Sequence, residues 1–157
     1  MRLADVLKED YIITDLKARG KRQLLEEMVS CAASRVDGVD AERVLNAILE
    51  REKFGSTGIG HGVAIPHGKI KGITEIRVFF GRSRPGVDFD SMDKRPVYLF
   101  FMIVAPENST AAHLKIMAGI SHLLKNQEFR HRLTTAETAG DVYRVIVEAD
   151  RRMGLSL

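Results

Sequence analysis

The residues best suited to chemistry lie in one segment, residues 50–70, which reads EREKFGSTGIGHGVAIPHGKI. Its second histidine, His67, stands between Pro66 and Gly68. Pro66 has a fixed φ angle and restricts Ile65 to extended backbone, whereas Gly68 lets the chain turn immediately afterwards. The backbone should therefore hold His67 in place, where its imidazole either acts as a nucleophile or only hydrogen-bonds a loop.

The glycines of the same segment fit neither common nucleotide-binding motif. Gly58, Gly60 and Gly62 form GxGxG, whereas a dinucleotide site needs GxGxxG between a strand and a helix. Residues 62–69 have the wrong spacing for a phosphate loop, and Ile70 stands where that loop needs Ser or Thr to hold magnesium. We therefore reject both kinds of nucleotide site.

Two amphipathic helices should precede this segment. Apolar residues recur at helical spacing over Lys21–Arg35, and Gly38 then breaks the pattern. Asp40 can accept hydrogen bonds from the free amides of a second helix, which runs on towards Lys53. Residues 55–68 hold five glycines and a proline, so a structured loop is expected there.

Strands and further helices should follow. Residues 73–80 are rich in β-branched and aromatic side chains, and residues 97–104 form a continuous apolar run, as in a central strand covered on both faces. A third helix should begin near Thr110 and reach Leu124, and a last helix should include Val142. Strands placed among helices in this way predict a layered α/β or α+β fold.

Size and composition are those of an ordinary globular chain. Its 157 residues are enough for one compact domain with a real core, and 45% of them are hydrophobic. The net charge of +3 comes from 24 basic and 21 acidic residues that are interspersed, without a nucleic-acid-binding motif. We therefore expect no nucleic-acid partner.

The sequence also favours a cytoplasmic location. Cys31 is the only cysteine, and the first ten residues contain no apolar run of a secretory signal. The longest apolar run, residues 97–105, is less than half of what a membrane-spanning helix needs. We expect no direct membrane insertion.

Several separated blocks resemble the mannitol/fructose-type enzyme IIA family of the phosphotransferase system. In chain order they are YIITDL, LEREKFGSTGIG, AIPHGK and the PEN…H segment that opens the third helix. The string GSTGIGxGxAIPHGK is especially similar to the nitrogen-regulatory branch. The resemblance implies a single type 2 enzyme IIA domain over residues 1–157, an α/β fold with a mixed β-sheet flanked by helices, and neither a dissociable cofactor nor a metal.

By this resemblance, His67 accepts a phosphoryl group from the histidine of an HPr-type carrier protein. A neutral ring nitrogen is nucleophilic near pH 7, and the resulting phosphoramidate stays reactive enough to be passed on. Arg51 matches the family's EREK block and falls on the buried stripe of the second helix. Its guanidinium is expected to stabilise the phosphoryl oxygens. Without the family match, the Arg51 side chain would instead be expected to extend to water or to pair with a nearby acidic residue.

His113 matches the family's second histidine and lies in the first turn of the third helix. The positive end of the helix dipole disfavours imidazolium, so this ring should stay neutral. It can then donate a hydrogen bond to the phosphoryl group or orient His67, although a histidine at a helix start can also simply meet solvent. His122 and His131 match nothing in the family and are expected on helix surfaces.

One position departs from the family pattern, because nitrogen-regulatory relatives commonly have Asn where this chain has His61. His61 is either an accessory proton donor or, in the favoured interpretation, a polar side chain that supports the glycine loop. A remote alternative is a metal-dependent hydrolase in which His61, His67 and His113 converge as three ligands.

Two functions within the family remain open. The preferred one is a regulator whose phosphorylation state controls its binding to target proteins, and the alternative is a transport component that passes the phosphoryl group to a sugar-specific enzyme IIB. A shallow apolar surface beside Phe54, Ile59 and Ile65 is expected to dock the partner, and the charge of a phosphoryl group on His67 would disturb that docking.

Overall fold

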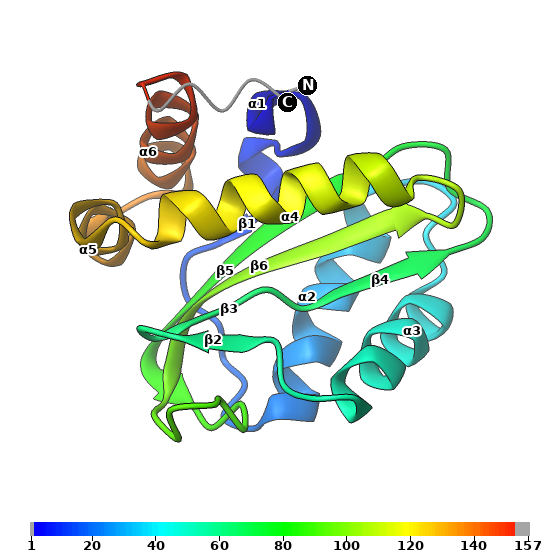
Figure 1. Cartoon of the computed structure of the whole chain (residues 1–157), viewed down its shortest axis with the longest axis horizontal. Coiled ribbons are helices and arrows are strands. Elements are labelled where there is room, and N and C mark those ends of the chain that lie inside the picture. Colours follow the sequence, from blue (N-terminus) through cyan, green and yellow to red (C-terminus); the bar gives the residue numbers. More distant parts are fainter. Residues whose placement is uncertain (1, 153–157) are drawn as a thin grey trace.

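The computed structural model describes residues 2–152, which form one mixed β-sheet with helices on both faces (Figure 1). The strand order is β1-β5-β6-β3-β2, and β4 also pairs with β6. In chain order the strands are β1 (Ile12–Ile13), β2 (Gly58–Gly60), β3 (Val63–Ala64), β4 (His67–Ile70), β5 (Arg77–Val87) and β6 (Val97–Pro106). The helices are α1 (Leu3–Val6), the 3₁₀ helix η1 (Glu9–Tyr11), α2 (Lys21–Arg35), α3 (Ala41–Lys53), α4 (Thr110–Leu124), α5 (Gln127–Thr135) and α6 (Ala139–Arg152). The predicted α/β fold with a mixed sheet flanked by helices is confirmed.

Strand β6 is the centre of the sheet. It pairs antiparallel with β5 and parallel with both β3 and β4, which follow one another along its other edge. Every residue of β6 except Tyr98 is buried, as its continuous apolar run predicts. The structured strand extends two residues beyond the predicted range of 97–104, to Pro106.

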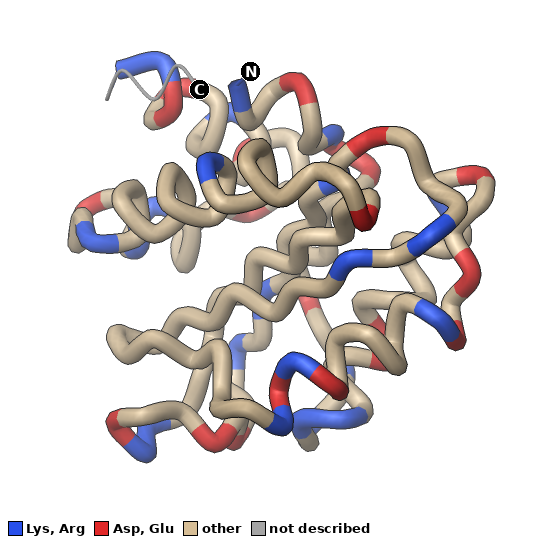
Figure 2. Tube along the Cα trace, turned by 45° about the vertical axis from the view of Figure 1, so that its right-hand side comes forward, with Lys and Arg blue, Asp and Glu red and all other residues tan. Residues whose placement is uncertain are grey.

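Helices α2 and α3 pack on one face of the sheet, and α4 lies across the other (Figure 1). A Cβ atom on Gly81 of β5 would meet Met28 of α2, and one on Gly68 of β4 would meet Ile48 of α3. Because side chains alternate along a strand, His67, the neighbour of Gly68, points towards the face that α4 covers. Figure 2 shows that the central strands are nearly free of charged residues, whereas both signs of charge are interspersed over the helices and loops.

The two predicted early helices are confirmed. Helix α2 has the predicted bounds, and Asp40 caps α3 by accepting hydrogen bonds from the amides of Glu42 (3.1 Å) and Arg43 (3.3 Å). Within the described part of the chain, no helix is both long and apolar enough to cross a membrane.

Two strand predictions are wrong in extent. Strand β5 begins at Arg77, four residues after the predicted start at 73, and continues to Val87 through a Gly-Arg-Ser-Arg-Pro-Gly stretch that is typical of a turn. Gly81 pairs with Phe100 and Arg82 with Leu99, and after an irregularity over residues 83–86 the pairing with β6 resumes at Val87. The predicted loop 55–68 contains β2, β3 and the start of β4, because β3 and β4 pair with the free backbone edge of β6 and β2 pairs in turn with β3.

A buried arginine joins the sheet to the C-terminal helices. Arg82 of β5 is 1% exposed, and its Nε donates to the Thr14 carbonyl at 3.0 Å. Its Nη1 donates to the carbonyls of Leu133 (2.9 Å), Thr134 (3.3 Å) and Ala136 (2.6 Å) at the C-terminal end of α5. Burial lowers the pKa of Arg82, and the carbonyl oxygens replace the water that its charge has lost.

Candidate active site

His67 is the first residue of β4, not part of a loop as predicted. The Ile103 amide of β6 donates to the Pro66 carbonyl at 2.9 Å, so backbone pairing begins immediately before the histidine. Pro66 itself has no amide hydrogen to donate, and the two-residue break 65–66 separates β3 from β4. The ring of His67 is half-buried at this strand start.

The imidazole of His67 has its tautomer set by the backbone. Its Nδ1 lies 2.9 Å from the Ile65 carbonyl oxygen, which can only accept, so Nδ1 carries the proton and donates. The other ring nitrogen, Nε2, therefore keeps its lone pair. Burial lowers the pKa of His67, the hydrogen bond to Ile65 partly opposes this, and the charge of Arg51 lowers it further. The ring is thus neutral and nucleophilic near pH 7.

His113 lies in the first turn of α4 beside His67. The two ring centroids are 5.2 Å apart and the ring planes are nearly perpendicular, at 83°. His113 is only 3% exposed, so the alternative of a helix-start histidine in solvent is wrong. Neither of its ring nitrogens has a hydrogen-bond partner among the described residues. Unpaired buried polar atoms are rare, and at a functional site they are available to a ligand.

Burial is the main reason why His113 is neutral. Its pKa falls from 6.5 to about 4, first through desolvation and then through the proximity of two other basic side chains, His67 and Lys69. The expected neutrality is therefore present, but the helix dipole that suggested it is not the leading cause.

Arg51 comes from the last turn of α3 and lines the same pocket as His67 and His113. Its Nη1 donates to the Gly55 carbonyl at 2.8 Å. The prediction that Arg51 lies on the buried stripe is wrong, because the stripe consists of Val44, Ile48 and Glu52. Arg51 is half-buried at the edge of that stripe, which gives its guanidinium access to the pocket and to solvent.

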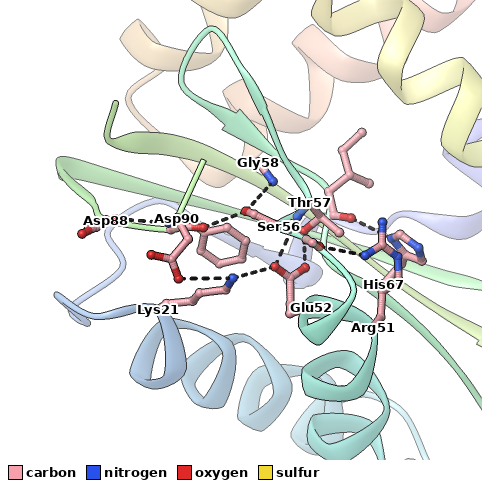
Figure 3. A network of polar contacts seen from close by, with 12 residues as sticks. Lys21, Arg51, Glu52, Ser56, Thr57, Gly58, His67, Asp88 and Asp90 are labelled. Carbon is pink, nitrogen blue, oxygen red and sulfur yellow. Dashed lines mark hydrogen bonds and ion pairs between the residues drawn. The ribbon is translucent and has the colours of Figure 1, made fainter. Parts of the chain in front are cut away.

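Glu52 is the buried charge of α3 that the sequence analysis did not identify (Figure 3). It forms an ion pair with Lys21 of α2 at 2.8 Å, and it accepts hydrogen bonds from the Thr57 amide, at 3.2 Å, and the Thr57 hydroxyl. These contacts tie the end of α3 to α2 and to the start of β2. A glutamate four residues after Ile48, on the apolar stripe, was the sequence signal for this network.

His61 lies apart from the pocket, exposed in the turn between β2 and β3. Its φ angle is +57°, and the flanking Gly60 and Gly62 also have positive φ angles, of 90° and 75°. Asn and His are among the few residues with side chains that enter this region readily, which explains why Asn is also acceptable here.

The three-histidine metal hypothesis has no support in this geometry. The residues from 2 to 152 contain no group of three or more His, Cys, Asp or Glu side chains that could hold a metal ion. His122 on α4 and His131 on α5 are exposed, as predicted.

The predicted apolar surface is only partly present. Phe54 is 87% exposed and Ile59 is 46% exposed, whereas Ile65 is buried as part of the hydrophobic core. Leu114 of α4, which lines the pocket, is 59% exposed and was not predicted.

Comparison with known proteins identifies the family to which this fold and site belong. Residues 5–149 match the family described as "Phosphoenolpyruvate-dependent sugar phosphotransferase system, EIIA 2". The chain belongs to the EIIA 2 family. As a member, it is a phosphoryl-carrying component of a phosphotransferase system, as the sequence resemblance predicted.

Both branches that the sequence left open appear among the EIIA 2 relatives. A nitrogen regulatory protein of Bradyrhizobium diazoefficiens is 38% identical over 146 residues, covering 93% of this chain and 95% of that protein. A fructose-specific EIIA component of Haloferax volcanii is 41% identical over 116 residues, or 74% of each chain. The crystal structure of nitrogen regulatory protein IIA-Ntr from Neisseria meningitidis has a TM-score of 0.86 and 32% identity, over 92% of this chain and 98% of that one.

Proposed function

We propose that His67 is the phosphoryl acceptor of this EIIA 2 protein and that Nε2 is the reacting atom. The observation that carries the proposal is the hydrogen bond from Nδ1 to the Ile65 carbonyl, because it leaves Nε2 as the free lone pair. The Nε2 lone pair attacks phosphorus in the phosphohistidine of an HPr-type carrier. As the new N–P bond forms, the donor's N–P bond breaks and its electron pair returns to the donor ring.

The neighbours of His67 are suited to this transfer. Nδ1 keeps its proton, and the Ile65 carbonyl stabilises the positive charge that the ring gains as its lone pair is used. Arg51 can turn its guanidinium from the Gly55 carbonyl to the phosphoryl oxygens. His113, neutral and without a partner among the described residues, can donate one hydrogen bond to the same oxygens.

The test is phosphorylation by phosphoenolpyruvate, enzyme I and an HPr-type carrier. Wild-type protein should gain one acid-labile phosphoryl group, and His67→Ala should gain none. His122→Ala is the matched control, because it removes an exposed histidine of α4, and it should be labelled like wild type. Labelling that persists in His67→Ala would assign the acceptor to another residue.

The proposed use of this phosphorylation is regulation, with the nitrogen-regulatory relatives as support. Phe54, Ile59 and Leu114 are exposed apolar side chains, and Leu114 lines the pocket together with Arg51 and Lys69, so a partner of the unphosphorylated form would meet apolar and positively charged surface there. A phosphoryl group on His67 adds about −1.5 to −2 charges in this pocket, so a partner fitted to the unphosphorylated site would no longer match it in charge. The regulatory partner should therefore bind the unphosphorylated form.

The second candidate function is sugar transport, which the fructose-specific relative supports. An enzyme IIB would need the phosphorylated form as its donor. A pull-down from native cytosol with phosphorylated wild type, unphosphorylated wild type and His67→Ala separates the two roles. Capture of a non-transport protein by the last two forms alone supports regulation, whereas transfer of phosphate to a captured enzyme IIB supports transport.

A further inference from the structure

Lys69 is a second cation in the pocket of His67. It lies two residues further along β4, and side chains two residues apart in a strand point to the same face. Its side chain is exposed and lines the pocket together with His67, Arg51 and His113. The Nζ atom donates to the hydroxyl of Thr110, the first residue of α4, at 2.8 Å.

Neither pocket cation is neutralised. Arg51 donates a hydrogen bond to the Gly55 carbonyl, and Lys69 donates one to the Thr110 hydroxyl. Both acceptors are uncharged. Over residues 2–152, no carboxylate forms an ion pair with either side chain within 4.0 Å; the two sequence neighbours of Arg51, Glu50 and Glu52, pair with Lys53 and Lys21. A phosphoryl group on His67 brings about two negative charges, which equals the charge of these two cations.

The start of α4 adds to the positive potential of this side. The Ser109 hydroxyl donates to the Pro106 carbonyl at 2.7 Å and does not cap the helix. The first-turn amides of this 15-residue helix therefore have no side-chain cap. His113, 3% exposed and unpartnered among the described residues, lines the pocket in the same turn, an independent sign that a ligand belongs there.

We propose that Lys69 binds the phosphoryl group on His67 from the α4 side, opposite Arg51 on the α3 side, and that Thr110 only holds Lys69 between transfers. The proposal rests on His67 as the acceptor. Lys69 exchanges a neutral hydroxyl for a phosphoryl oxygen, and a bond between two charged groups is shorter and roughly twice as strong as a neutral one. It thereby stabilises both the transferring group and the phosphorylated product.

The experiment measures the rate of phosphoryl transfer from the phosphorylated HPr-type carrier at fixed salt. Lys69→Met should slow it about tenfold to a hundredfold, and Lys69→Arg should restore it to within about threefold of wild type. Thr110→Val should stay within about threefold of wild type, because it removes only the resting partner. Lys115→Met is the matched control: it removes an equal charge from an exposed site on α4 outside the pocket.

Two further measurements separate binding from a merely structural role. Urea unfolding should give Lys69→Met the stability of wild type, since Lys69 is exposed and makes no ion pair among the described residues. The rate of spontaneous hydrolysis of the phosphohistidine should change in Lys69→Met and stay unchanged in Lys115→Met, because this rate involves no docking of a carrier.

Each outcome is decisive. A wild-type transfer rate in Lys69→Met overturns the role of Lys69, and so does equal slowing in Lys69→Met and Lys115→Met, which would mean that both only attract the carrier. If wild type is not phosphorylated on His67 at all, the acceptor assignment fails, and this is seen before any Lys69 variant is compared.

Discussion

Arg51 and Arg82 carry the same guanidinium group in two contrasting regions. Arg82 is buried, and it donates to carbonyls of Thr14, Leu133, Thr134 and Ala136. Arg51 is half-buried at the pocket, and among the described residues it donates to one acceptor, the Gly55 carbonyl. The first arginine uses its donors to hold elements together, whereas most donors of the second have no partner among the described residues and are free for the proposed ligand. The number of hydrogen bonds at rest thus separates a structural cation from a functional one.

The largest effect should come from Arg51→Ala. Losing a charge-assisted contact to the moving phosphoryl group should slow transfer on the order of a thousandfold, which corresponds to about 4 kcal/mol. The free energy of unfolding should change by less than about 1 kcal/mol, because only one partly exposed hydrogen bond is lost. Quench-flow labelling and urea unfolding measure the two quantities. A folded variant with a normal rate would remove Arg51 from the mechanism.

Arg82→Met should show the opposite pattern. The substitution leaves several carbonyl oxygens at the end of α5 without their donor, so the free energy of unfolding should fall by about 3 kcal/mol or more. The fraction that remains folded should transfer phosphate within about threefold of wild type, because Arg82 is not among the residues that line the pocket. Arg84→Met is the control, since that exposed arginine forms a surface ion pair with Asp15. Equal destabilisation by both would break the comparison.

The pH dependence of the free energy of unfolding also distinguishes the pocket around His113 from the buried site of Arg82. The unfolded His113 ring binds a proton near pH 6.5, but the buried ring does so only near pH 4. Between these values the unfolded state binds more protons, so stability falls as the pH falls, by about 2 kcal/mol from pH 7 to pH 5. His113→Gln should lose this contribution in urea unfolding and keep the separate decrease due to His67, whose pKa burial also lowers. Arg82→Met should keep the wild-type pH slope although it is less stable throughout.

The smallest effect belongs to His61. His61→Asn should raise the free energy of unfolding by at most about 0.5 kcal/mol, whereas His61→Val should lower it by about 1–2 kcal/mol, because a β-branched residue is strained at positive φ. Both variants should transfer phosphate at the wild-type rate. Slower transfer in stable His61→Asn would instead support the accessory role considered from the sequence.

The sequence predicts what depends on local pattern. Helix α2 follows from its helical periodicity, and the cap at Asp40 follows from side-chain chemistry. Strand β6 follows from its continuous apolar run, because a half-exposed strand would alternate apolar and polar residues. The position of His67 against Pro66 also follows locally, because proline limits its own backbone and that of the preceding residue.

The features that the sequence misses depend on pairing across the fold. The stretch after Phe80 has turn-forming residues, yet β6 keeps it in the sheet, and Arg82 is buried there only because α5 presents its carbonyls. The choice between Arg51 and Glu52 for the buried stripe is a difference of one residue, or about 100° around a helix. Lys21, more than thirty residues before Glu52 in the chain, forms the ion pair that allows Glu52 to be the buried residue.

The bond from His67 to Ile65 lies within three consecutive residues, and this has a consequence for the direction of transfer. In the proposed reaction, the His67 ring that receives a phosphoryl group and the ring that gives it up hold the same proton on the same atom. Neither step has to wait for a proton from water or from a visiting protein. Loading and unloading can therefore follow one path in reverse, and the relative phosphoryl-transfer potentials of the two proteins decide which way the group travels.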